Sequence, residues 1–366
     1  SSSSSSSSSA REEYYVGIDV GGTTIGVGVV RGDGVMVATA ERPISGDAGA
    51  RSASRVADLI AELVRTALAS VVAVGGGRGA VGLAPGDVVQ FGIGAPGLLD
   101  CERGVVKAIA NFDWGEEVAL TTEVARRLGV SAARVHLEND ANAALLAEMW
   151  VGAGRGKSNI VMLTLGTGIG GAILSDGRLL RGSSGDAGEL GHTILVPGGR
   201  LHGSTGVRGI FEGYASATAV VARAVEKLEA RRDDDFDRSH PSPLADLAAR
   251  GELRCADVFF HAAPERGALQ DPVAVCLVEE TAEHLGIGCI NVCRNFDPEI
   301  IVLTGGMTKA GLQLLEKVRA AYAAHHWNIS AVDPARIVLA SCGNAAGKIG
   351  AAAVGFLKEH ADFAVA

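Results

Sequence analysis

Two hydrophobic patterns alternate along the chain and together predict an α/β protein. Short apolar runs bounded by glycine-rich or polar turns predict strands, which are expected at residues 14–20, 25–30, 35–40, 88–92, 135–137 and 300–306. Apolar residues spaced three and four positions apart predict an amphipathic helix at 53–69. Other helices are expected at residues 120–128, 217–230, 273–293 and 343–353. Strands that alternate with helices are typical of a largely parallel sheet.

One strand–turn–strand unit occurs twice. Residues 159–174 run from an apolar strand through Gly166-Thr167-Gly168 into a second strand, and they resemble residues 17–30, which turn at Gly21-Gly22. An internal repeat of this kind predicts two similar lobes, each with a glycine turn at the end of a strand.

The length and composition agree with two lobes, and the glycine turns account for part of the high glycine content. A length of 366 residues suggests two domains. Hydrophobic residues make up 47% of the chain and aromatic residues only 4%, which predicts a core of Ala, Val, Leu and Ile. The 50 glycines are about 14% of the chain, roughly twice the average usage. Some belong to the two turns, and others to a loop at 73–87 with no assigned chemistry.

Charge and cysteine content exclude several classes of protein. With 33 Lys and Arg against 42 Asp and Glu, the net charge of −9 argues against a nucleic-acid-binding face. No apolar run is long enough to span a membrane, and the nine N-terminal serines do not form a signal peptide. Six scattered cysteines without a Cys-x-x-Cys pair predict free thiols and a cytoplasmic or other reducing intracellular location.

The first candidate site is the turn after the first strand. It comprises Asp19, Gly21, Gly22, Thr23 and Thr24. Glycines let backbone amides approach an anion, and an acid at a strand end can hold Mg²⁺ or its waters beside a phosphate. A hairpin with a glycine bulge is the structural alternative. The turn lacks the Walker A ending, and the glycines at 166–171 lead into a strand, unlike a Rossmann dinucleotide site.

Two further clusters place polar side chains beside small residues. Asp140 follows a strand and starts a helix, where it is either an N-cap or a general base, with Asn139 orienting a polar ligand. Glu189 and His192 lie between glycines, and Glu212 follows them. These three suit hydrogen bonding to a polyol; a surface glutamate and a satisfied core histidine are the ordinary alternative.

In their order, these motifs resemble the ROK family of sugar kinases. The matching segments lie at residues 19–23, 94–97, 138–142, 166–171, 188–192, 212–216 and 303–306. The resemblance implies a two-lobed actin-like, hexokinase-like α/β fold, a duplicated ribonuclease H-like unit with a cleft between the lobes. We expect a low-complexity tail at 1–13, a small lobe from 14–139 and about 349–366, and a large lobe from 140–348.

The same resemblance implies a role for each candidate residue. The phosphates of ATP are expected at Asp19, Gly21, Gly22, Thr23, Thr24, Gly166, Thr167 and Gly168, with Gly305 and Gly306 near the adenosine. Mg²⁺ is expected near Asp19. The sugar is expected at Gly97, Asn111, Asn139, Asp140, Glu189, His192 and Glu212, with Trp114 closing the pocket. A sugar hydroxyl must lose a proton as it attacks the γ-phosphorus, and Asp140 is the expected general base.

The activity implied is that of an ATP-dependent hexokinase, with the 6-hydroxyl of glucose as the first expected acceptor. An N-acetylmannosamine or N-acetylglucosamine kinase is the alternative. A sugar-sensing ROK repressor is less favoured, because only 13 residues precede the first strand. ATP or polyphosphate could be the donor. Sugar and ATP are the expected partners, without nucleic acid or membrane, and a homodimer or homotetramer is expected.

One departure from the family pattern concerns zinc. Many ROK proteins bind zinc through the histidine of the Gly-Glu-x-Gly-His segment and three following cysteines. Here His202, Ser204 and Ile210 stand near the cysteine positions, in a segment one residue longer. A structural zinc site needs four ligands, so no zinc is expected and His192 is expected to contact the sugar.

Overall fold

The computed structural model describes residues 12–44, 51–72, 82–109, 112, 114, 117–185, 187–231, 242–263, 270–325 and 333–360. Asn111, the serine tract and most of the 73–87 loop lie outside the described residues. Contacts within the chain define two compact units. Unit 1 consists of Ser1–Val151 and Cys342–Ala366, and unit 2 consists of Gly152–Ser341.

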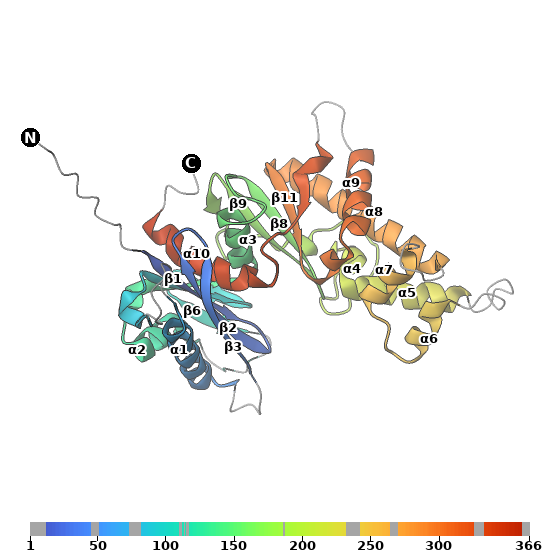
Figure 1. Cartoon of the computed structure of the whole chain (residues 1–366). Coiled ribbons are helices and arrows are strands. Elements are labelled where there is room, and N and C mark those ends of the chain that lie inside the picture. The colour runs from blue at the N-terminus through green and yellow to red at the C-terminus, as the bar shows by residue number, and fades with distance from the viewer. Residues whose placement is uncertain are drawn as a thin grey trace, which may run out of the picture. The chain divides into compact units, whose positions relative to one another are not determined.

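The sheet of unit 1 combines an antiparallel meander with two parallel strands (Figure 1). Its strands are β1 (Tyr14–Val20), β2 (Thr24–Arg31), β3 (Met36–Pro43), β4 (Gln90–Ala95) and β7 (Val135–Asn139). They are arranged in the order β3-β2-β1-β4-β7, with β4 parallel to β1 and β7 parallel to β4. A separate ribbon pairs β5 (Leu98–Asp100) with β6 (Val105–Ala108).

Helices cover both faces of this sheet. They are α1 (Ala53–Ala69), α2 (Leu120–Leu128), α3 (Asp140–Trp150) and α10 (Ala346–Glu359), with short 3₁₀ turns η2 (Pro85–Asp87), η3 (Ala132–Arg134) and η9 (Gly343–Ala345). Because side chains alternate along a strand, Val16 and Ile18 of β1 join the apolar core with α1 and α2. Gly17 faces the other way, where a Cβ would overlap the carbonyl oxygen of Lys348 in α10. Glycine here lets α10 lie directly on the sheet.

Close packing between α10 and α3 shows that α3 is part of unit 1. A Cβ at Gly350 of α10 would overlap the backbone of Ala143 in α3, so these two helices touch backbone to backbone. α3 therefore belongs to unit 1. The chain leaves this unit after Val151, rather than after residue 139, and it returns at Cys342, rather than at about residue 349.

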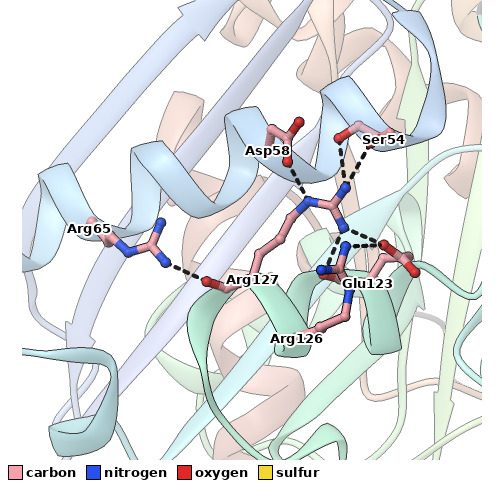
Figure 2. A network of polar contacts seen from close by, with 6 residues as sticks. All are labelled: Ser54, Asp58, Arg65, Glu123, Arg126 and Arg127. Carbon is pink, nitrogen blue, oxygen red and sulfur yellow. Dashed lines mark hydrogen bonds and ion pairs between the residues drawn. The ribbon is translucent and has the colours of Figure 1, made fainter.

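A polar network joins α1 to α2 at the edge of the core (Figure 2). Arg127 of α2 donates to Asp58 of α1 at 2.5 Å and to the hydroxyl of Ser54 at 2.8 Å. It also pairs with Glu123 in its own helix. The Arg127 side chain is only 10% exposed. Hydrogen bonds from arginine hold the pKa values of Asp58 and Glu123 below their usual range, so both carboxylates stay charged.

The sheet of unit 2 repeats the topology of unit 1. Its strands are β8 (Ile160–Leu165), β9 (Ile169–Ser175), β10 (Arg178–Leu179), β11 (Ile300–Thr304) and β12 (Ile337–Leu339). The order is β10-β9-β8-β11-β12, again an antiparallel meander followed by two parallel strands. The repeat that the sequence predicts therefore appears as two sheets of one design.

Helices of unit 2 pack into a second apolar core. They are α4 (Glu212–Ala215), α5 (Ala217–Arg231), α6 (Pro243–Ala249), α7 (Cys255–Ala262), α8 (Pro272–Phe296) and α9 (Leu312–Ala324), with 3₁₀ turns η4 (Leu190–His192), η7 (Gly306–Ala310) and η8 (Pro334–Arg336). The longest, α8, is preceded by its N-cap Asp271, whose carboxylate accepts the Val273 N–H at 2.7 Å. No helix within the described ranges has the length and apolar character needed to cross a membrane.

Candidate functional site

The turn between β1 and β2 carries a half-buried carboxylate. The N–H of Gly21 donates to the carbonyl of Thr24 at 2.9 Å, which closes the turn and leaves Thr23 and Thr24 exposed. Asp19, the last residue but one of β1, points to the α10 side, where a Cβ at Gly347 would overlap its Oδ2. Burial raises the pKa of Asp19 and the charge of Asp140 raises it further, while Lys348 lowers it. The structure thus places Asp19 within electrostatic reach of Asp140.

Asp140 stands at the first position of α3, next to the capping residue. The side chain of Asn139 is the N-cap: its Oδ1 accepts the N–H of Ala141 at 2.9 Å and that of Asn142 at 3.2 Å. The capping role considered for Asp140 therefore belongs to its neighbour. Asp140 is exposed as a whole residue, but protein atoms around its carboxyl displace water, and this desolvation raises the pKa. Hydrogen bonds from the Ala141 backbone and the Asn139 side chain lower the pKa in part. A carboxylate with a raised pKa is a better proton acceptor.

The strand-to-helix turn that presents Asp140 rests on Glu138. This carboxylate is 1% exposed, and its Oε1 accepts the N–H of Asn139 at 3.0 Å and the side-chain amide of Asn142 at 2.9 Å. The sequence assigns no role to Glu138. Its position directly before the Asn139-Asp140 pair is the signal that identifies it.

The turn between β8 and β9 is tied to the start of α5. The N–H of Gly166 donates to the carbonyl of Gly168 at 3.0 Å, and the N–H of Ala217 donates to the carbonyl of Gly166 at 2.9 Å. The hydroxyl of Thr218 donates to the carbonyl of Thr167 at 2.6 Å. These bonds hold the turn rigidly at the N-terminus of a helix, a place that favours anions.

A cavity of about 500 Å³ opens beside this turn. It is lined by Gly166, Thr167, Ala217, Arg254, Cys255, Ala256, Phe259, Gly306, Met307, Lys309 and Ala310. Three predicted nucleotide residues (Gly166, Thr167 and Gly306) thus come together. Gly305, at φ 96°, lies against the backbone of Leu165. Apolar walls with two basic side chains can hold a flat ring that carries an anionic group.

The α7 side of this cavity is not predicted from the sequence. Arg254, Cys255 and Phe259 line it, and no helix is predicted there. The one sequence signal for this helix is Asp257 in its first turn, whose carboxylate accepts the N–H of the N-cap residue Arg254 at 2.8 Å. Burial raises the pKa of Cys255 to about 12, so the thiol is neutral and forms part of the apolar wall.

A second cavity of unit 2, about 420 Å³, contains Glu212. It is lined by Thr167, Gly168, Arg200, Leu201, His202, Gly203, Ser204, Glu212, Gly213, Ser216, Thr218, Ala219 and Ala222. Glu212 Oε2 accepts the N–H of Ile169 at 2.7 Å, and Oε1 lies 3.0 Å from Nε2 of His202. The glutamate predicted for the sugar therefore also braces the β8–β9 turn.

The other predicted sugar residues of unit 2 lie on the surface. Glu189 and His192 have side chains 63% and 49% exposed, with 3.7 Å between Glu189 Oε2 and His192 Nδ1. Neither residue lines either cavity of unit 2 described above. The alternative of a core histidine is therefore wrong for His192, which is free to meet a ligand from solvent.

Of the predicted sugar residues in the β4–α2 region, the structure describes Gly97 but not Asn111. Gly97 has φ 100°, and a Cβ there would overlap the carbonyl of Ala108. The indole N–H of Trp114 donates to the carbonyl of Arg51 at 2.7 Å, so its polar atom serves the fold.

The residues near His202 do not fit a zinc ion. Ile210 is buried and apolar, and the two ring nitrogens of His202 face Glu212 Oε1 and the Thr205 hydroxyl at 3.0 and 2.9 Å. Within the described ranges no group of three or more His, Cys, Asp or Glu could hold a metal ion. Asp19 is the residue here that could hold a different cation, because carboxylate oxygens are the ligands that Mg²⁺ prefers and a second carboxylate, Asp140, lies within electrostatic reach.

Comparison with known proteins finds one matching family and several similar sequences and structures. A sequence profile described as the ROK family matches residues 15–356. The chain is 33% identical to a glucokinase of Halalkalibacterium halodurans over 340 residues, which cover 93% of this chain and 94% of the relative. It is 35% identical to a glucokinase of Thermotoga maritima over 307 residues, 83% of this chain and 85% of the relative.

A solved structure shows the same fold. A ROK family glucokinase from Streptomyces griseus, crystallised with glucose and AMPPNP, matches with a TM-score of 0.67 at 30% identity, covering 93% of this chain and 98% of its own. The sequence-based prediction of a two-domain, hexokinase-like α/β fold is confirmed.

Proposed function

The chain belongs to the ROK family and is an ATP-dependent sugar kinase of the glucokinase type, and we propose that it phosphorylates the 6-hydroxyl of glucose. The likeness to glucokinases over most of the chain carries this conclusion. The turns of the two sheets and the Asn139-Asp140 pair supply the groups that phosphoryl transfer requires.

The nucleotide is assigned to the cavity beside the β8–β9 turn. Phe259 and Met307 offer apolar surface to the adenine ring, and Arg254 and Lys309 are the basic side chains of the lining. The phosphates lie along Gly166, Thr167 and Gly168, where the N-terminus of α5 favours negative charge. The family resemblance also assigns Gly21, Gly22, Thr23 and Thr24 to the phosphates and Gly305 and Gly306 to the adenosine.

Asp140 acts as the general base that accepts the proton of the attacking hydroxyl. Its raised pKa supports this role, because a stronger base lowers the cost of proton transfer. Asn139 orients Asp140 through its side-chain hydrogen bond while its own Oδ1 caps α3. The sugar is held by Gly97, Asn111, Asn139, Asp140, Glu189, His192 and Glu212.

Asp19 is the residue that would hold Mg²⁺ or its waters. When bound, the ion neutralises charge on the phosphates. The half-buried Asp19 carboxylate and the nearby charge of Asp140 support a cation at this place.

A coupled ADP-release assay with ATP and Mg²⁺ tests the function. The panel contains glucose, mannose, fructose, N-acetylglucosamine and N-acetylmannosamine, and inorganic polyphosphate replaces ATP in a second series. We expect the highest kcat/KM with glucose and ATP. Higher kcat/KM with an N-acetylhexosamine would change the acceptor, and no turnover with any sugar would reject the kinase.

A homodimer or homotetramer is also proposed. Of the ten exposed large hydrophobic side chains among the described residues, four belong to residues 194–207 of unit 2: Ile194, Val196, Leu201 and Val207. Such a cluster supports burial against a second copy. Light scattering after size exclusion should give twice or four times the 37.3 kDa chain mass, and a monomer would contradict the proposal.

A further inference from the structure

The hairpin of residues 194–210 holds one histidine beside the Glu212 carboxylate. Backbone bridges pair Ile194 with Ile210 and Leu201 with Arg208. The N–H of His202 donates to the carbonyl of Val207 at 2.9 Å. The His202 side chain is 14% exposed, so the hairpin keeps its ring largely out of solvent.

Both ring nitrogens of His202 have partners. Nε2 lies 3.0 Å from Glu212 Oε1, and Nδ1 lies 2.9 Å from the hydroxyl oxygen of Thr205. Because a carboxylate only accepts hydrogen bonds, Nε2 carries the proton that is donated to Glu212. In the neutral ring Nδ1 then accepts a hydrogen bond from the Thr205 hydroxyl, so the bonds to Glu212 and to Thr205 require the same tautomer.

The other oxygen of Glu212 is fixed from the opposite direction. Oε2 accepts the N–H of Ile169 at 2.7 Å, and a Cβ at Gly168 would overlap that oxygen. One donor on each oxygen therefore sets the rotation of the carboxylate. Glu212 is 16% exposed and lines the 420 Å³ cavity, so its free lone pairs are available to a ligand there.

We propose that His202 is a positioning residue that holds the Glu212 carboxylate in the orientation that binds the sugar, a role that rests on the proposed function. Ser204 and Ile210 stand where the family resemblance implies zinc-binding cysteines, and their side chains do not fit a zinc ion. The His202–Glu212 bond fastens the hairpin to the β8–β9 turn in place of a metal. A carboxylate oriented before the ligand arrives loses less conformational freedom on binding.

Three variants test this role by steady-state kinetics with glucose and ATP varied separately. His202→Ala removes the donor to Glu212. His202→Gln restores an N–H donor at about the place of Nε2. Arg208→Ala is the control, because Arg208 is exposed in the same hairpin and donates only to the carbonyl of Gly199 among the contacts described.

We expect His202→Ala to raise the glucose KM about tenfold to a hundredfold, the range for a lost hydrogen bond to a charged group. Its ATP KM should change less than about threefold, because Ile169 still holds Oε2. His202→Gln should recover most of the glucose KM, and Arg208→Ala should keep it.

An unchanged glucose KM in His202→Ala would overturn the positioning role while the proposed function stands. Equal rises in the glucose and ATP KM values would also overturn it, because they indicate general loosening. If His202→Ala fails to fold, His202→Asn replaces it, since its shorter amide does not reach Glu212; its glucose KM must then exceed that of His202→Gln. Wild-type protein without turnover would reject the proposed function itself.

Discussion

The β1–β2 turn of unit 1 and the β8–β9 turn of unit 2 occupy the same place in two sheets of one topology. Each follows the first strand of an antiparallel meander and lies beside a parallel strand. The last ladder pairs are Val20 with Ile25 in unit 1 and Leu165 with Ile169 in unit 2, so the second turn is one residue shorter. The difference lies in where each turn obtains a carboxylate.

In unit 1 the strand itself carries the acid. Asp19 stands one residue before the end of β1, while Thr164 has that position in β8 and accepts the Gly170 N–H at 3.0 Å. In unit 2 the acid is Glu212 of α4, which reaches the turn from 43 residues further along the chain. One scaffold thus carries a strand-borne carboxylate in unit 1, where we propose a cation, and a turn braced by a distant glutamate in unit 2, where we propose the phosphates.

The largest expected effect separates these two positions. Asp19→Asn should lower kcat/KM about a hundredfold or more, the range for removal of one preorganised electrostatic group. Thr164→Val should leave kcat/KM within a few-fold and lower the free energy of unfolding by about 1–3 kcal/mol, because the Gly170 N–H loses its acceptor. Kinetics and urea unfolding of both variants measure the contrast. Equal losses of activity would show that the two positions are not specialised.

Each unit also contains a nearly buried arginine that joins two helices, and these give the next largest effect. Arg127 connects α2 to α1, and Arg223, 5% exposed, connects α5 to Glu280 of α8. Replacing either with alanine should lower the free energy of unfolding by about 2 kcal/mol. Arg126, with a side chain 65% exposed, is the control, and its replacement should cost less than about 0.5 kcal/mol. Denaturant titration measures the free energy of unfolding of the three variants. Equal losses in all three would contradict a special role for Arg127 and Arg223.

Two carboxylates give a smaller effect of opposite sign in the two units. Burial and the Asp140 charge raise the pKa of Asp19, so its ionised form destabilises the folded state at neutral pH. Asp19→Asn should therefore raise Tm at pH 7, and this gain should vanish as pH falls below the ordinary carboxyl range, where Asp19 is protonated in both states.

Glu280 shows the reverse behaviour. Burial raises the pKa of Glu280, but hydrogen bonds from Lys227 and Arg223 together outweigh this effect and lower the pKa to about 2. Its charge stabilises the folded state above the ordinary carboxyl pKa, and this stability is lost as pH falls toward 2. Glu280→Gln should lower Tm at pH 7 and have little effect near pH 2. A Tm-against-pH series checks both signs, and a loss of Tm in Asp19→Asn at pH 7 would contradict the account of Asp19.

The sequence predicted those elements whose pattern is local. The helices at 53–69 and 120–128 and the strand at 14–20 have the predicted bounds, because an amphipathic or apolar run contains the whole signal. The strand predicted at 88–92 is shifted, since β4 is Gln90–Ala95. Gly92, where the predicted strand ends, lies inside β4 and gives α10 room to pack, because a Cβ there would overlap the carbonyl of Ala351.

Other elements and contacts could not be read from the chain alone. β12 has three residues and α7 has eight, too few for a clear period. The last helix begins at Ala346, after a 3₁₀ turn, and extends to Glu359 rather than 353. The family resemblance named Glu212, yet its bonds to Ile169 and His202 depend on folding between distant segments.

The central claim is that Asp140 of unit 1 is the base of a sugar kinase, and Asp140→Asn tests it most directly. Amide in place of carboxylate keeps the shape and the α3 cap of Asn139 but removes the proton acceptor. Glucose binding, measured by calorimetry, should stay within about threefold, while kcat with glucose and ATP should fall by about 10²–10⁴-fold. A variant that binds glucose normally and keeps kcat within a few-fold of wild type would contradict the claim.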